Sequence, residues 1–133
     1  MKVGMTRRPQ LRSLLWFDCL AGGLVGLATL ALSGPLSRLL GLPHAVLLFT
    51  AFANLAYATF SYSLARHAQP SRRRVQALIV ANAAWPVVCV ALAASLAGPG
   101  RWLGVAYLLA EGVFVGGLAA VEAVVARARP PSP

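Results

Sequence analysis

The stretch WLGVAYLLAEGVFVGGLAAVEAVVA, residues 102–126, decides the fold class of this chain. It exceeds the ~20 apolar residues that a helix needs to cross a bilayer, and its only charged side chains are Glu111 and Glu122. A second such stretch, LLWFDCLAGGLVGLATLAL at residues 14–32, contains Asp18, the third and last acidic residue of the chain. A carboxylate in hydrocarbon costs about 2.5–3.5 kcal/mol even on insertion scales, so we expect each one to have a partner or a function.

The overall composition is that of a membrane protein. Of the 133 residues, 59% are apolar and 11% are charged, whereas soluble domains carry about 25% charged residues. The net charge of +9 does not indicate nucleic-acid binding, because the basic residues gather between the apolar runs and no aromatic–basic motif accompanies them. The richness in Arg, Ala, Gly, Leu and Val is typical of a GC-rich bacterial genome.

Four stretches are long and apolar enough to span a membrane, and together they predict one integral membrane domain, residues 1–133. The predicted spans are residues 13–32, 43–65, 75–97 and 102–126. Turn residues separate them, namely Ser33-Gly34-Pro35, Gln69-Pro70-Ser71 and Gly98-Pro99-Gly100. Because these connections are short, we expect an all-α, up-down-up-down bundle of four transmembrane helices.

The basic residues predict the orientation of the bundle. Ten of them fall on one side of the predicted spans, namely Lys2, Arg7, Arg8, Arg12, Arg66, Arg72, Arg73, Arg74, Arg127 and Arg129. The opposite side has only Arg38 and Arg101. This asymmetry predicts a multi-pass protein of the inner membrane with both termini in the cytoplasm, where the arginines meet anionic lipid headgroups.

Each predicted span also carries polar or aromatic side chains at helical spacing, so that each span has one polar face. Lipid offers no hydrogen-bond partner, and these faces should therefore converge inside the bundle. We expect them to form one substrate-binding zone in the half of the bilayer nearer the cytoplasm, built from Asp18, Asn54, Tyr57, Asn82, Trp85 and Glu111.

These residues do not all indicate function to the same degree. Asn54 and Asn82 taken alone are more typical of hydrogen bonds that join helices. Asp18 and Glu111 favour a functional role, because no Lys or Arg lies within any span to neutralise them. Glu122 is expected near the cytoplasmic edge in a structural role, paired with Arg12, Arg127 or Arg129.

Small residues and one proline indicate where helices meet or bend. Two GxxxG motifs predict close helix packing, either within one chain or between copies in a homo-oligomer. Their glycines are Gly22, Gly26, Gly112 and Gly116. Pro86 cannot donate a hydrogen bond to the carbonyl group of Asn82, so we expect a kink there.

A weak internal similarity indicates that the chain consists of two related helical hairpins. A shift of 64 residues places Leu32-Ser33-Gly34-Pro35 on Leu96-Ala97-Gly98-Pro99 and Asp18 on Asn82. A shift of 57 residues places Asn54 on Glu111. Such a duplication would relate the hairpins by a pseudo-two-fold axis along the membrane normal and make the polar positions members of one central site.

No motif for nucleotide, zinc or nucleophilic chemistry is present in the sequence. His44 and His67 lie at opposite ends of the second predicted span and cannot share a metal ion, while Cys19 and Cys89 lie in apolar runs at different depths. We therefore expect no metal site and no cofactor.

Three functions remain open at this point. The sequence favours a transporter-like or channel-like protein that binds a cation, a proton or a small amine-bearing solute at Asp18 and Glu111. A lipid-active enzyme, or a protein that binds an apolar ligand beside buried carboxyl groups, is the second hypothesis. The third is an accessory subunit whose glycine faces dock a larger membrane partner. Whether the protein is an enzyme stays open, and a role without catalysis is favoured.

Overall fold

The computed structural model describes residues 2–67 and 69–127, with side chains from residue 10 onward. This part of the chain is helical and contains no strand, which confirms the expected all-α class. Its five helices are α1 (Lys2–Ala31), α2 (Ser33–Leu40), α3 (His44–Ala65), α4 (Arg72–Leu96) and α5 (Trp102–Arg127).

Four of these helices are long and apolar enough to cross a membrane, namely α3, α4, α5 and the segment Gln10–Ala31 of α1. Large apolar side chains cover their outer faces. Leu24 of α1, Val87 of α4 and Val113 of α5 are among the most exposed. A soluble bundle would bury such side chains to remove them from water. In a membrane they contact lipid tails, which are equally apolar, so their exposure carries no hydrophobic penalty. The described helices therefore indicate an integral membrane protein.

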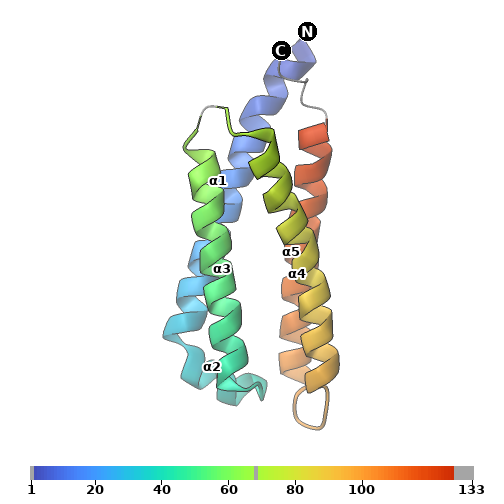
Figure 1. Ribbon diagram of the computed structural model, residues 1–133. Coiled ribbons are helices and arrows are strands. Elements are labelled where there is room, and N and C mark those ends of the chain that lie inside the picture. Colours follow the sequence, from blue (N-terminus) through green and yellow to red (C-terminus); the bar gives the residue numbers. More distant parts are fainter. Residues whose placement is uncertain (1, 68, 128–133) are drawn as a thin grey trace.

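The long helices pack as two pairs. α1 lies mainly against α3, and α4 mainly against α5, whereas the two pairs touch each other more sparsely. Figure 1 shows that α2 and the α4–α5 loop lie at one end of the molecule and the α3–α4 connection at the other. We call these pairs the first hairpin (α1 and α3) and the second hairpin (α4 and α5).

The glycine motifs account for the close packing within each hairpin. A Cβ atom placed on Gly26 of α1 would lie 3.0 Å from the carbonyl oxygen of Ala51 in α3. A Cβ atom on Gly112 of α5 would lie 3.1 Å from Cβ of Cys89 in α4. Gly22 and Gly116 make similar approaches to the same partner helices. The sequence left open whether the glycine motifs pack helices within one chain or between two copies. The structure shows that they pack helices within one chain.

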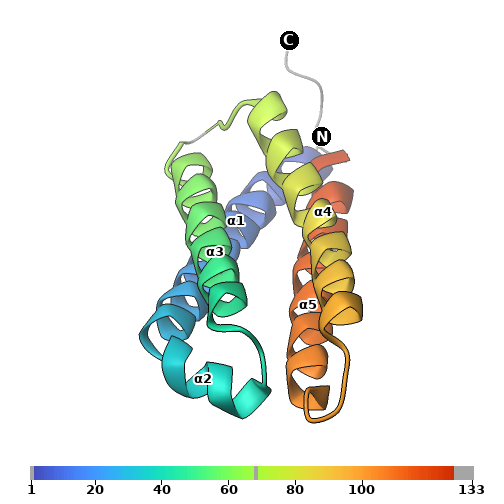
Figure 2. The ribbon, with the colours of Figure 1, turned by 60° about the horizontal axis from the view of Figure 1, so that its bottom comes forward.

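Helix α2 was not predicted. The break at Ser33-Gly34-Pro35 was expected to form a loop, but it forms the first turn of this helix. Proline is tolerated there, because amide groups in the first turn have no partner within the helix. α2 lies across the end of the bundle (Figure 2) and ends at Gly41, whose φ of 67° suits glycine.

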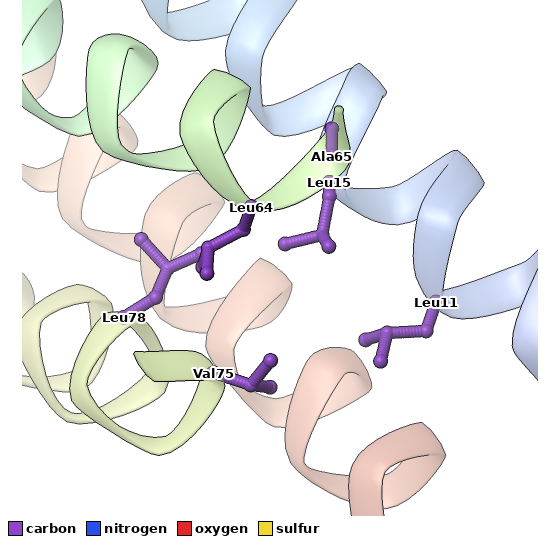
Figure 3. Close-up of a cluster of buried hydrophobic side chains, with 6 residues drawn as sticks. All are labelled: Leu11, Leu15, Leu64, Ala65, Val75 and Leu78. Carbon is purple, nitrogen blue, oxygen red and sulfur yellow. The ribbon is translucent and has the colours of Figure 1, made fainter. Parts of the chain in front are cut away.

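Two clusters of buried apolar residues lie toward the two ends of the bundle. The proximal layer, shown in Figure 3, lies near the start of α1 and consists of Leu11, Leu15, Leu64, Ala65, Val75 and Leu78. The distal layer, next to α2, consists of Leu40, Leu42, Leu47, Ala93 and Leu108. The buried acid and amide groups lie in the middle of the bundle beside a third apolar cluster, which consists of Trp85, Cys89 and Val115.

The glycine contacts predict a position-specific loss of stability. Gly112→Ile should lower the free energy of unfolding by about 1–3 kcal/mol, because the new side chain would collide with α4. Gly117→Ile is the matched control, since a Cβ atom there meets nothing within 4 Å. Unfolding by dodecyl sulfate in mixed micelles measures both variants. Equal destabilisation would show that helix propensity, and not the contact with α4, is responsible.

Candidate ligand-binding site

The first half of the site is a buried amide shared by two carboxyl groups. Nδ2 of Asn82 in α4 donates to Oδ2 of Asp18 in α1 at 3.0 Å and to Oε2 of Glu122 in α5 at 3.3 Å. Asp18 is 6% exposed, and Asn82 and Glu122 are each 1% exposed. Since one of these bonds joins α1 to α4, it connects the first hairpin to the second.

The second half of the site repeats this arrangement closer to the middle of the helices. Nδ2 of Asn54 in α3 donates to Oε1 of Glu111 in α5 at 2.6 Å, again between the two hairpins. The same amide also donates to the carbonyl oxygen of Thr50 at 2.9 Å. Polar groups of Trp85 and Tyr107 lie close to the Glu111 carboxyl group.

Several polar atoms around Glu111 are buried without a hydrogen bond. Among the described residues, they include Oε2 of Glu111, Nε1 of Trp85 and the hydroxyl group of Tyr107. A buried polar group without a partner costs about 1–3 kcal/mol. A molecule that donates to Oε2 of Glu111, or that carries a positive charge beside it, would remove the part of that cost that belongs to the carboxyl group.

A cavity of about 320 Å³ lies between α1 and α5 and connects the two halves of the site. Asp18, Asn54, Tyr107 and Glu111 line it together with apolar side chains such as Phe114. Its size lies within the range of small-molecule sites, which are mostly apolar with a few polar groups that orient the ligand. The cavity can therefore hold a small organic molecule beside two carboxyl groups.

The structure brings half of the predicted substrate-binding residues to this cavity. Asp18, Asn54 and Glu111 line it, while Tyr57, Asn82 and Trp85 are not part of its lining. Asn82 holds Asp18 by a hydrogen bond. The hydroxyl group of Tyr57 donates to the carbonyl oxygen of Ala81 at 3.1 Å, and its ring packs edge-on against the Trp85 ring, with centroids 5.9 Å apart.

Glu122 was expected to face the headgroups and pair with arginine, and this expectation is wrong. It is almost fully buried, and its hydrogen-bond partner is Asn82. Arg12 and Arg127 are exposed, while Arg129 lies outside the described residues, as do the side chains of Lys2, Arg7 and Arg8. The physical reason is helical register, because residues 111 and 122 are three turns apart on one face of α5.

Tyr107 and Phe114 line the cavity but were not among the predicted site residues. The helical spacing places both on the same face as Glu111, and that spacing alone did not distinguish lining residues from packing residues. Pro86, where a kink was expected, lies inside α4, and the helix continues on both sides of it. The proline ring packs against the glycine face of α5, because a Cβ atom on Gly116 would lie 2.9 Å from Cγ of Pro86.

No protein-family model, curated protein or solved structure matches this chain. Functional inference therefore depends on the geometry of the site. Within the described ranges, no group of three His, Cys, Asp or Glu side chains could hold a metal ion. The groups that the site offers are carboxyl oxygens, amides, a phenol and an indole.

Removal of the Asn82 amide alone should lower stability, whereas replacement of the amide and both of its carboxyl partners by apolar side chains should restore it. Asn82→Leu should reduce the free energy of unfolding by about 1–3 kcal/mol, because two buried carboxyl groups lose their donor. Adding Asp18→Leu and Glu122→Leu should restore much of that loss, since a fully apolar replacement leaves no buried polar group unsatisfied.

The matched control for Asn82→Leu is Gln76→Leu, which removes an exposed amide from the same helix. It should leave stability unchanged within about 0.5 kcal/mol. Unfolding in mixed micelles measures all of these variants. If the triple variant were no more stable than Asn82→Leu, the carboxyl groups would not be the reason why the amide matters.

Proposed function

We propose that this chain is a transporter-like membrane protein that binds a small protonated amine in the cavity between α1 and α5. The observation that carries the proposal is that Asp18 and Glu111 line one cavity inside an apolar bundle, in which no Lys or Arg lies within residues 13–32, 43–65, 75–97 or 102–126. Intramembrane carboxyl groups of this kind are functional candidates by default, and a cationic ligand is the partner they lack.

The lining of the cavity favours an organic ammonium ion over a metal ion. Calcium requires six to eight oxygen ligands at about 2.3–2.6 Å, whereas the cavity is lined mainly by apolar residues. The rings of Phe114 and Tyr107 also lie in the lining, and aromatic faces attract organic cations. An ammonium group would donate to Asp18 and Glu111 while its carbon atoms contact the apolar side chains.

The arrangement of the helices supports four crossings of the inner membrane with both termini in the cytoplasm. The α3–α4 connection, which adjoins Arg66 and Arg72–Arg74, lies at the same end as the start of α1 (Figure 1). These four arginines are exposed, as is Arg12. Anionic headgroups on the cytoplasmic side would attract them.

A transport role is supported by the way in which the hairpins meet. The pairs that hydrogen-bond across the hairpins, Asp18 with Asn82 and Asn54 with Glu111, are the pairs that the shifts of 64 and 57 residues equate. Equivalent residues of two repeats meet in this way at a pseudo-two-fold axis, and rocking of one repeat against the other is a common transport mechanism. An ammonium ion that competes for the carboxyl groups would loosen this junction.

A second candidate is a protein that binds a neutral apolar ligand or acts on a lipid. The apolar majority of the cavity lining favours it, and buried carboxyl groups can serve as general acid and base. The accessory-subunit hypothesis loses its main support, because the glycine faces proposed for docking are occupied by helices of the same chain.

Phenethylammonium and its neutral counterpart 2-phenylethanol distinguish the two candidates. We expect the purified protein in nanodiscs to bind the amine, and Glu111→Gln or Asp18→Asn to weaken this affinity by at least about tenfold, equivalent to ~1.4 kcal/mol. Calorimetry or equilibrium dialysis provides the measurement. Preferential binding of the alcohol would instead support the apolar-ligand candidate.

Gln76→Leu is the control for these variants, because Gln76 is exposed and lies outside the cavity and the acid–amide bonds. It should change the amine affinity less than about threefold, since a group outside the site makes no direct contact with the ligand. If it weakened binding as much as Glu111→Gln and Asp18→Asn, a general change in the protein would explain the loss better than contact with the ammonium group.

Thiol labelling tests the proposed topology. With Cys19 and Cys89 replaced by serine, Arg73→Cys should react with an impermeant maleimide only in inside-out vesicles. Pro99→Cys should react only in right-side-out vesicles, because the two positions lie at opposite ends of α4. Labelling of both from one side would contradict a helix that crosses the membrane.

A further inference from the structure

The cavity that holds Asp18 and Glu111 lies between α1 and α5 and reaches the lipid-facing side of the bundle. The proximal layer joins α1, α3 and α4, and the distal layer includes residues of α3, α4 and α5. Two residues of the cavity lining, Val25 and Phe114, are 39% and 48% exposed. In a membrane, that outer side faces lipid tails.

A second hollow lies along the same pair of helices, closer to the start of α1 and the end of α5. Its volume is about 650 Å³. It is lined by Gln10, Ser13, Leu14, Phe17, Val121 and Val125. We call it the outer hollow, because four of these six side chains are exposed on the surface of the described helices. Its lining contains no charged residue and is mostly apolar.

Two aromatic rings mark the boundary between the hollow and the cavity. Phe17 lines the outer hollow and Phe114 lines the inner cavity. Their ring centroids lie 6.2 Å apart. The α1–α5 side of the bundle thus presents, in order, an apolar hollow, a pair of aromatic rings and a cavity with two carboxyl groups.

We propose that the ligand is a single-chain amphiphile with an ammonium head, and that it enters the cavity sideways from the lipid between α1 and α5. The head binds at Asp18 and Glu111, and the tail passes Phe17 and Phe114 into the outer hollow. This inference rests on the proposed function and adds the ligand class and the entry route. Charge complementarity supports it, since the anionic groups lie only at the inner end of this path.

The same geometry argues against a strongly hydrated solute. On the path along α1 and α5, such a solute would meet mostly apolar side chains and the rings of Phe17 and Phe114, and stripping water from a charge there is costly. An amphiphile is already concentrated in the bilayer and only has to move its head between two helices. Its tail would contact the mostly apolar lining of the outer hollow.

Decylammonium and phenethylammonium serve as long and short probes, with the protein in nanodiscs. Val121→Trp should fill the outer hollow and weaken decylammonium affinity by at least about tenfold, as the loss of contacts to only two methylene groups would do. Phenethylammonium affinity should not change, because this short probe fits within the inner cavity. Val124→Trp on the same helix is the control, since Val124 is more exposed and lies outside the hollow.

A second pair of variants applies if Val121→Trp does not fold. Phe17→Ala should speed the dissociation of decylammonium by removing one ring of the boundary. Phe52→Ala, which removes an equally exposed ring from α3, should not affect it. Equal effects of the two substitutions in either pair would overturn the proposed route.

The wild-type protein separates failure of this inference from failure of the proposed function. Binding of phenethylammonium without binding of decylammonium would overturn the lateral route and leave the amine site intact. Binding of neither amine would reject the proposed function itself. A change in oligomeric state caused by Val121→Trp alone would show that the α1–α5 side is an interface between copies, which also overturns the inference.

Discussion

The acid–amide hydrogen bonds are the constraint on which the rest of this structure depends. Each hairpin is held together by close glycine contacts, but the two hairpins touch sparsely. Asp18 with Asn82 and Asn54 with Glu111 form the buried side-chain bonds that cross between them. Tyr57 adds a bond to the backbone of α4. Because the carboxyl groups have amides as partners and no cation, the junction that orders the bundle is also the place where a positive charge would bind.

The acid–amide hydrogen bonds lie among buried apolar side chains, where they are stronger than they would be in water. The same low polarity makes every unsatisfied atom costly, and Oε2 of Glu111 is one such atom. α2 contributes to the distal layer through Leu40. When the site is empty, the amides satisfy only part of the hydrogen-bonding capacity of the carboxyl groups. A ligand that satisfies the remaining part would therefore bind favourably.

The sequence predicted the helices well because their signal is simple. Long apolar runs separated by proline and glycine require helices in a membrane, and the period of 3.6 residues placed Asp18, Asn54 and Glu111 toward one interior. The sequence-based prediction was wrong where tertiary packing determines the local structure. The run Ser33-Gly34-Pro35 looks like a turn, yet it begins α2, because Leu40 and Leu42 gain burial against α3 and α5. Glu122 looked like an interface residue from its depth alone, while its register on α5 turned it inward toward Asn82. Neither the cavity nor its open side could be deduced from spacing, since both depend on how far apart α1 and α5 lie.

Direct binding of a protonated amine to the carboxyl groups of the cavity can be tested by solid-state NMR in bilayers, with ¹⁵N-labelled phenethylammonium and protein labelled with ¹³C at aspartate and glutamate carboxyl carbons. We expect dipolar contacts from the ammonium nitrogen to Asp18 and Glu111, at ion-pair separations of about 4 Å between nitrogen and oxygen. Bound amine that shows contacts only to lipid headgroups, or to neither of these two carboxyl groups, would contradict it.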